Sequence, residues 1–237
     1  MTQMHNAQIP PEMAAHVARR RGGRLHAYDA IDPARTALVV IDMQNLWCQE
    51  GQIAYSPYCA GIGDNINRLA ASARAAGSKV WWVKAIYQDA PTTWSSYMGY
   101  HSPEDVAAMT GALSEGRDEA EIWGAMDVAP DDEIVIKRRF SAMVRGSSDL
   151  EDRLRSAGID MLVVTGVATD VCVESTVRDA FMLDFRNIVV SDATATRSDD
   201  AQNASLGAMF NHFADVYATD EVAGLFAAAG TGAVAAE

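Results

Sequence analysis

Cysteines are few, and their pattern excludes two classes of protein. The 237 residues include three, Cys48, Cys59 and Cys172, at irregular spacing and without a Cys-x-x-Cys pair. An odd number of scattered thiols argues against a disulfide framework and against a thiolate zinc site. This usage is typical of a reducing compartment, so we expect a cytoplasmic protein.

Basic residues and long apolar runs are also scarce. The chain has 19 Lys and Arg against 32 Asp and Glu, a net charge of −13. Because phosphate binding needs a basic surface, this balance disfavours nucleic acid as a partner. No run approaches the roughly 20 apolar residues of a membrane span, and the N-terminus lacks a signal-peptide core. We therefore expect neither a nucleic-acid nor a membrane partner.

Short apolar segments alternate with segments of helical periodicity. The apolar segments predict strands at 37–43, 79–86, 133–140, 161–166, 187–191 and 214–218. The helical segments lie at 64–76, 103–113, 148–158, 170–184 and 198–213, with a last helix after Thr219. Strands that alternate with helices predict an α/β fold, a three-layer α/β/α sandwich around a mostly parallel, doubly wound six-stranded sheet.

The two ends of the chain differ from this pattern. Residues 1–30 contain the breakers Pro10-Pro11 and Gly22-Gly23 and predict an N-terminal arm. The basic cluster Arg19–Arg21 within it is interpreted as solvated or as packed on a neighbouring subunit. Residues 229–237 predict a flexible tail, which leaves 31–228 as the domain.

Polar residues that follow buried strands are candidates for a site, because ligands bind at the carboxyl ends of strands in such sheets. Asp42 follows four aliphatic residues, Lys137 follows Ile-Val-Ile, and Cys172 lies where a helix begins. Each has a simpler interpretation: a loop-capping acid, a surface lysine, or an inert buried thiol. Together they supply a base, an ammonium and a nucleophile, and a helix N-terminus is expected to lower the thiol pKa.

Four segments carry a family resemblance. ALVVIDMQN at 37–45, IKRRFSAM at 136–143, SSDLEDRLRSAGI at 147–159 and VVTGVATDVCVESTVRDA at 163–180 resemble the isochorismatase-like cysteine hydrolases, which include N-carbamoylsarcosine and ureidoacrylate amidohydrolases. The resemblance covers about residues 35–226. It implies that Asp42, Lys137 and Cys172 form the catalytic triad, and that residues 31–228 are the hydrolase domain.

The resemblance also implies finer features. It implies a cis peptide bond between Val167 and Ala168, and an oxyanion hole formed by the backbone N–H groups of Ala168 and Cys172. It further implies a homo-oligomer, a dimer or tetramer. Nicotinamidases of the family bind a metal through histidines after the second strand, but residues 85–94 contain none. We therefore expect no metal and no cofactor.

The activity expected is cleavage of a C–N bond in a small amide, carbamoyl or ureido substrate through a thioester intermediate, with release of ammonia or an amine. Two alternatives stay open: an isochorismatase-type vinyl-ether hydrolase, and a non-catalytic interaction module on the same fold. Loop residues near the expected edge are candidates for substrate binding: Gln44, Asn45, Trp47, Tyr87, Trp94, Tyr97, Arg139 and Phe140. Several of these would equally serve as core residues, and Arg139 would equally pair with an acid.

Overall fold

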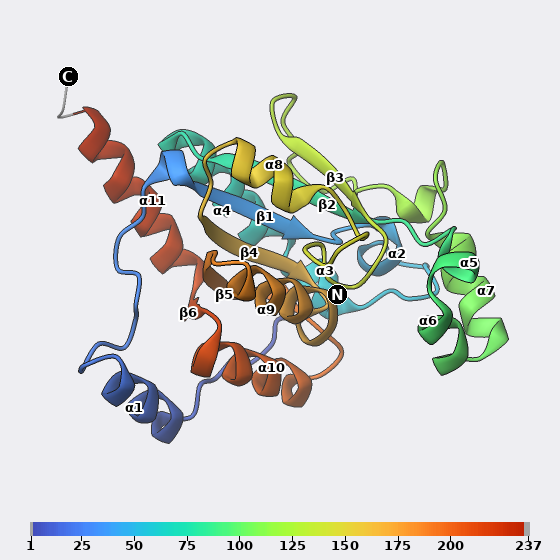
Figure 1. The fold of residues 1–237 in the computed structure, drawn as a ribbon, viewed down its shortest axis with the longest axis horizontal. Coiled ribbons are helices and arrows are strands. Elements are labelled where there is room, and N and C mark those ends of the chain that lie inside the picture. The colour runs from blue at the N-terminus through green and yellow to red at the C-terminus, as the bar shows by residue number, and fades with distance from the viewer. Residues whose placement is uncertain (1, 235–237) are drawn as a thin grey trace.

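A single parallel sheet organises the chain (Figure 1). The computed structural model describes residues 2–234. The sheet comprises β1 (Thr36–Ile41), β2 (Lys79–Ala85), β3 (Glu133–Lys137), β4 (Met161–Val167), β5 (Arg186–Ala195) and β6 (Asp215–Tyr217). Its order is β3-β2-β1-β4-β5-β6, and every neighbouring pair is parallel. The predicted six-stranded doubly wound sheet is confirmed, with the order reversing between β1 and β4.

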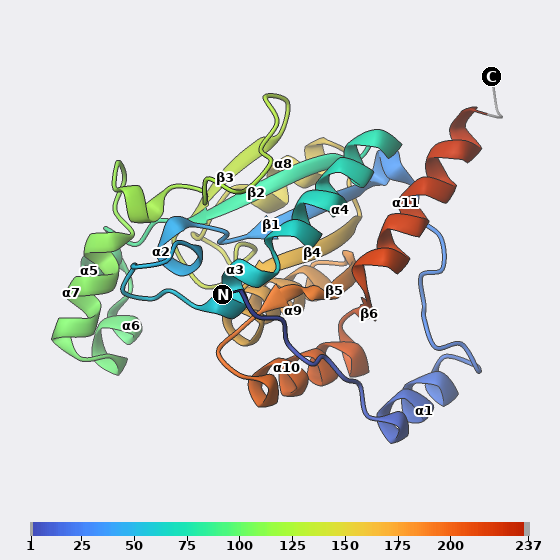
Figure 2. The ribbon, with the colours of Figure 1, turned by 180° about the vertical axis from the view of Figure 1, so that it is seen from behind.

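Helices cover both faces of the sheet. One face packs against α4 (Gly63–Ala76) and α11 (Thr219–Val234), which lie in front in Figure 2. The other packs against α8 (Leu150–Ser156), α9 (Glu174–Met182) and α10 (Asp199–His212). Successive strand residues point to opposite faces, so Val39 enters one apolar core while Val40 enters the other. A strand buried on both faces explains why its sequence is a continuous apolar run.

The remaining elements are short and lie mostly in the connections. They are α1 (Pro11–Arg20), η1 (Pro33–Arg35), α2 (Asn45–Cys48), α3 (Pro57–Gly61), α5 (Ala90–Thr93), α6 (Ser95–Tyr100), α7 (Pro103–Ala112), η2 (Asp118–Ala120) and η3 (Thr169–Val173). Helices α5, α6 and α7 form a lobe beyond the carboxyl end of β2 (Figure 1). Within this lobe, α7 matches the helix predicted at 103–113.

Several boundaries differ from the expected ones. Helix α4 ends as predicted at Gly77, whose φ of 89° is accessible to glycine. Strand β3 was expected to reach Phe140 but ends at Lys137. Helix α11 continues to Val234, so most of the predicted tail is helical; residues 235–237 lie outside the described residues.

The N-terminal arm packs on its own domain. Helix α1 lies beside α10 (Figure 1), and the guanidinium of Arg21 forms an ion pair with the fully buried Asp215 at 2.5 Å. The backbone N–H groups of Ala27 and Tyr28 donate to the other oxygen of Asp215. Arg21 of the Arg19–Arg21 cluster therefore anchors the arm to its own domain. The expected dimer or tetramer stays a prediction. Within residues 2–234, no helix combines the length and apolar character needed to cross a bilayer.

Candidate active site

Three strand ends bring the predicted catalytic residues together. Asp42 directly follows β1, Lys137 is the last residue of β3, and Cys172 lies in the turn after β4. Strands β1 and β4 flank the point where the strand order reverses, which is where such sheets bind ligands. Asp42 has a φ of 53°, a left-handed conformation that aspartate tolerates better than most residues. The topology thus gathers three residues that are far apart in the sequence.

The Lys137 ammonium is the centre of this cluster. Its Nζ lies 2.9 Å from Asp42 Oδ2 and 3.4 Å from Cys172 Sγ. It also donates to the hydroxyl of Tyr87 at 3.0 Å and to the carbonyl of Arg139 at 3.1 Å. The exposed fractions of the Lys137 and Asp42 side chains are 0% and 1%. A buried lysine is held as a cation only when acceptors surround it, and here they do.

Burial and charge decide the resting protonation of the cluster. Burial raises the pKa of Asp42, and the opposing ammonium of Lys137 does not cancel this effect. Burial alone would lower the pKa of Lys137, but Asp42 and Cys172 raise it well above its usual value. Burial raises the pKa of Cys172 to about 12, although Lys137 acts in the opposite direction. The expectation that the helix N-terminus lowers this thiol pKa is therefore wrong for the free enzyme, because desolvation dominates.

The turn that carries Cys172 is a single π-helical turn, η3, leading into α9. Such turns are rare and occur frequently at functional sites. The carbonyl of Ala168 closes the turn by accepting hydrogen bonds from the N–H groups of Val171 and Val173, both at 3.1 Å. The peptide bond between Val167 and Ala168 is cis. The turn therefore presents Cys172 within a tightly defined backbone.

Gly166 allows β4 to approach β1 closely just before this turn. Its φ is 104°, and a Cβ at this position would lie 2.0 Å from the carbonyl oxygen of Ile41. No L side chain fits there without moving the strands apart. Glycine is thus required where the strand carrying the nucleophile passes the strand carrying the carboxylate.

Four aromatic rings form a wall beside the cluster. This aromatic wall consists of Tyr87, Trp94, Tyr97 and Phe140, with ring centroids 4.8 to 6.4 Å apart. Phe140 packs both with this group and with the core that contains Cys172. Cys172 is 7% exposed, so the wall and the turn leave little of the thiol open to solvent. The wall combines residues that follow β2 and β3 with residues of the lobe, which were only separate candidates in the sequence.

The other predicted substrate-binding residues are placed differently. Gln44 is fully buried, and its amide bonds to backbone groups of Ala85 and Ala120. Asn45 donates to the carbonyl of Asp118. These two amides tie β1 to neighbouring segments, which does not support the substrate role expected for them. Trp47 is half-buried and packs beside the aromatic wall.

Arg139 points into the lobe. Its guanidinium lies 5.1 Å from the ring centroid of Trp94 and donates to the carbonyl of Thr93 at 2.6 Å. Arg139 lies beyond the end of β3, which stops at Lys137. Its carbonyl accepts from Lys137, so the residue joins the charged cluster to the aromatic wall through its main chain.

One role was not foreseen from the sequence. Tyr87 was a candidate for contact with substrate, but its hydroxyl is an acceptor for the Lys137 ammonium. Burial raises the pKa of Tyr87 well above its usual value, which keeps the hydroxyl neutral. The only signal available was its position two residues after β2, at the same edge as the three strand ends.

Comparison with known proteins agrees with this architecture. A family model for the isochorismatase domain matches residues 36–221. The ureidoacrylate amidohydrolase RutB of Methylobacterium radiotolerans is 32% identical, covering 86% of this chain and 85% of that protein. RutB of Serratia proteamaculans is 35% identical, covering 75% and 77%.

Solved structures give the same result. A cysteine hydrolase from Pseudomonas syringae pv. phaseolicola 1448A superposes with a TM-score of 0.75 at 29% identity, covering 84% of this chain and 95% of that one. The N-carbamoylsarcosine amidase of Thermoplasma acidophilum superposes with a TM-score of 0.63 at 27% identity, covering 78% and 97%. With the family match spanning most of the chain, the protein belongs to the isochorismatase-like cysteine hydrolase superfamily.

Proposed function

We propose that the protein is an amidohydrolase that cleaves a C–N bond of a small amide, carbamoyl or ureido compound, with Cys172 as nucleophile. The observation that carries this proposal is the cluster itself: Lys137 Nζ lies 2.9 Å from Asp42 and 3.4 Å from the sulfur of Cys172. Nucleophile, base and cation within contact distance are the parts that covalent acyl transfer requires. The names of the ureidoacrylate and N-carbamoylsarcosine enzymes support the choice of a C–N bond.

Acylation starts from a neutral thiol. Because the pKa of Cys172 is raised to about 12, the thiol loses its proton as it attacks, and Asp42 accepts that proton. A carboxylate whose pKa is raised by burial is a stronger base than an exposed one. The sulfur bonds to the carbonyl carbon, and the backbone N–H groups of Ala168 and Cys172 hold the oxyanion. Lys137 balances the negative charge that builds up beside it.

The same carboxyl group completes the turnover. Asp42 returns its proton to the leaving nitrogen, the C–N bond breaks, and ammonia or an amine departs from the thioester. Water then attacks the thioester carbon and gives a proton to Asp42. The C–S bond breaks, and the proton passes to the sulfur, which restores the thiol.

The aromatic wall is the proposed substrate contact. Rings of Trp94 and Phe140 lie 4.8 Å apart in an edge-to-face arrangement next to the core around Cys172. Flat faces of this kind stack on planar amide or ureido groups. We infer that the wall moves when substrate enters, because the thiol is only 7% exposed in the free enzyme.

The test is ammonia release from a panel of small amides, carbamoyl compounds and ureides. We expect Cys172→Ala to lower kcat by about a thousandfold or more, because the covalent route is lost. Cys59→Ala is the matched control, since this thiol is also buried but lies on α3, away from the cluster. Activity that survives in Cys172→Ala would contradict the proposal and favour the vinyl-ether type of chemistry.

A further inference from the structure

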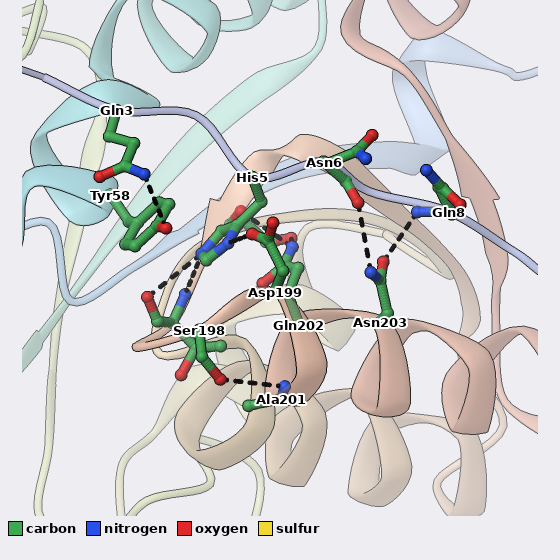
Figure 3. Close-up of polar contacts among 12 residues, drawn as sticks. Gln3, His5, Asn6, Gln8, Tyr58, Ser198, Asp199, Ala201, Gln202 and Asn203 are labelled. Carbon is green, nitrogen blue, oxygen red and sulfur yellow. Dashed lines mark hydrogen bonds and ion pairs between the residues drawn. The ribbon is translucent and has the colours of Figure 1, made fainter.

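The N-terminal segment runs across the domain from Tyr58 on α3 to Asn203 on α10 (Figure 3). The N–H of Gln3 donates to the carbonyl of Pro57, and its side chain donates to the hydroxyl of Tyr58 at 2.8 Å. Farther along, the N–H of Gln8 donates to Asn203 on α10. The segment therefore joins α3 to α10 across the end of β5. It lies wholly outside residues 36–221, which match the family.

His5 is the buried centre of this segment. Its side chain is 2% exposed, and its ring stacks on Tyr58 at 4.0 Å with an interplanar angle of 3°. Nδ1 lies 2.7 Å from a carboxylate oxygen of Asp199, as Figure 3 shows. Because that carboxylate only accepts, Nδ1 carries a proton. The other ring nitrogen, Nε2, lies 3.2 Å from the backbone nitrogen of Thr196.

Thr196 connects His5 to the nucleophile turn. It follows β5 directly and is buried, and its carbonyl lies 3.1 Å from the same ring nitrogen. Its hydroxyl donates to the carboxylate of Asp170 at 2.5 Å. Asp170 belongs to η3, two residues before Cys172. Two contacts thus link the arm to the turn that carries the sulfur.

This link holds the exposed side of the turn. The inner side is held separately, because Ser205 on α10 donates to the carbonyl of Thr169 at 3.2 Å. Asp170 itself is exposed. We therefore expect its hydrogen bond with Thr196 to fix the position of the turn more than it stabilises the core.

We propose that His5 of the N-terminal segment is a positioning residue that holds Thr196 and, through it, the turn that carries Cys172. This role rests on the proposed function only in that the reaction measured is the proposed C–N cleavage. A nucleophile and its oxyanion donors need placement within a fraction of an ångström, and a loosened turn costs rate without loss of the fold. The arm would then be a functional part of this chain.

The test compares His5→Ala with Asn203→Ala. Asn203 also holds the arm, through Gln8 and the carbonyl of Asn6, but does not contact the turn. We expect His5→Ala to lower kcat about tenfold to a hundredfold, with KM changed less than threefold. Asn203→Ala should stay within about twofold of the parent enzyme in kcat. The midpoint of urea unfolding, measured for both, shows whether the two variants are comparably stable.

A second measurement does not depend on any substrate. The rate at which iodoacetamide alkylates Cys172, followed by mass spectrometry of its peptide, should rise severalfold in His5→Ala because the turn opens. A fall in kcat with a rise in alkylation marks a displaced nucleophile. This readout still tests the arm if every amide in the panel proves inert, so failure of the proposed activity is recognised separately.

Two conservative variants separate the two contacts of the ring. The amide of His5→Gln can take the place of Nε2 near Thr196, whereas the amide of His5→Asn can take the place of Nδ1 near Asp199. We expect His5→Gln to keep more of kcat than His5→Asn, and Thr196→Val to behave like His5→Ala. Equal kcat and alkylation rates in His5→Ala and Asn203→Ala would overturn the proposal, as would a Thr196→Val enzyme indistinguishable from the parent.

Discussion

Two buried carboxylates in this protein have opposite surroundings. Asp132, before β3, accepts hydrogen bonds from Nε and Nη2 of Arg74, from Nε1 of Trp82 and from the N–H of Ala129. The four distances are 2.6 to 3.0 Å. Asp42 instead faces the Lys137 ammonium at 2.9 Å and the thiol of Cys172. Both side chains are almost fully buried, with exposed fractions of 3% and 1%.

The pKa values follow from this difference. Burial pushes the pKa of Asp132 upward, but the hydrogen bonds from Arg74 and Trp82 outweigh it, so the pKa is lowered. Burial dominates at Asp42, and its pKa is raised. A carboxylate whose charge is stabilised more than burial disfavours it binds a proton weakly. One whose burial is not offset binds a proton more readily and is better suited to act as a base.

The largest expected effects come from replacing each of the two carboxylates by its amide. Asp42→Asn should lower kcat by about a thousandfold, because the base is lost. Asp132→Asn should leave kcat within about twofold and lower the free energy of unfolding by about 1–3 kcal/mol, because Arg74 and Trp82 lose an ionised acceptor. The measurements are ammonia release at saturating substrate and urea unfolding for each variant.

The stability arm of that experiment is equally specific. Asp42→Asn removes a carboxylate whose ionised form burial disfavours, but it also leaves the buried Lys137 ammonium without its anionic partner. We therefore expect it to lower the free energy of unfolding at least as much as Asp132→Asn does. An Asp42→Asn protein as stable as the parent would show that Lys137 does not depend on this carboxylate.

The pH dependence of activity should differ from the pH dependence of stability, because the first depends on Asp42 and the second on Asp132. Asp42 acts as a base only when ionised, so activity should fall as pH drops through its raised pKa, with a midpoint above the ordinary value of 3.8. The pKa of Asp132 is lowered by folding, so its contribution to stability is full above the unfolded pKa and is lost as pH falls through the lower folded one. On acidification, activity should therefore decline before this part of the stability does.

To test whether activity declines before stability, kcat/KM and the midpoint of urea unfolding are measured as functions of pH. Asp132→Asn should flatten the acid part of the stability profile and leave the acid limb of activity in place. An acid limb with a midpoint below 3.8 would mean that the base is a carboxylate with an ordinary or lowered pKa.

The sequence predicted much of this site because each catalytic candidate ends or follows an apolar run. A parallel sheet places such ends at one edge, so Asp42, Lys137 and Cys172 could be grouped before any geometry was known. The thiol pKa could not be obtained this way, because the effect of a helix N-terminus is local whereas desolvation depends on the whole fold. Local pattern likewise could not show that the Gln44 amide is used by backbone groups.

Contacts over long separations were invisible for the same reason. His5 and Thr196 are 191 residues apart, and nothing in the arm sequence indicates which partner its histidine has. The length of β3 was overestimated because Arg138, Arg139 and Phe140 continue a plausible strand pattern. In the fold, the Arg138 N–H instead donates to the carbonyl of Ser147, and the chain leaves the sheet. Patterns locate elements, whereas the partner of a polar group depends on the tertiary structure.

The smallest expected effect concerns the acceptors around Lys137. Tyr87→Phe removes the hydroxyl that lies 3.0 Å from Nζ but leaves the carbonyl of Arg139 and the carboxylate of Asp42 in place. One hydrogen bond to a charged group is worth about 1.5–3 kcal/mol, so kcat should fall about tenfold if part of this loss appears in the transition state. The control is Tyr97→Phe, which removes a hydroxyl from the same aromatic wall but outside the set of groups that Lys137 binds.

The two Michaelis parameters distinguish the possible roles of Tyr87. If its hydroxyl orients the ammonium, kcat falls while KM stays close to that of Tyr97→Phe, because the substrate keeps all of its contacts. If the hydroxyl binds substrate directly, KM rises with little change in kcat. Equal kcat values in the two variants would show that Lys137 is adequately held by Asp42 and the Arg139 carbonyl. The role of Tyr87 would then be limited to the aromatic wall, and the charged cluster would consist of Asp42, Lys137 and Cys172 alone.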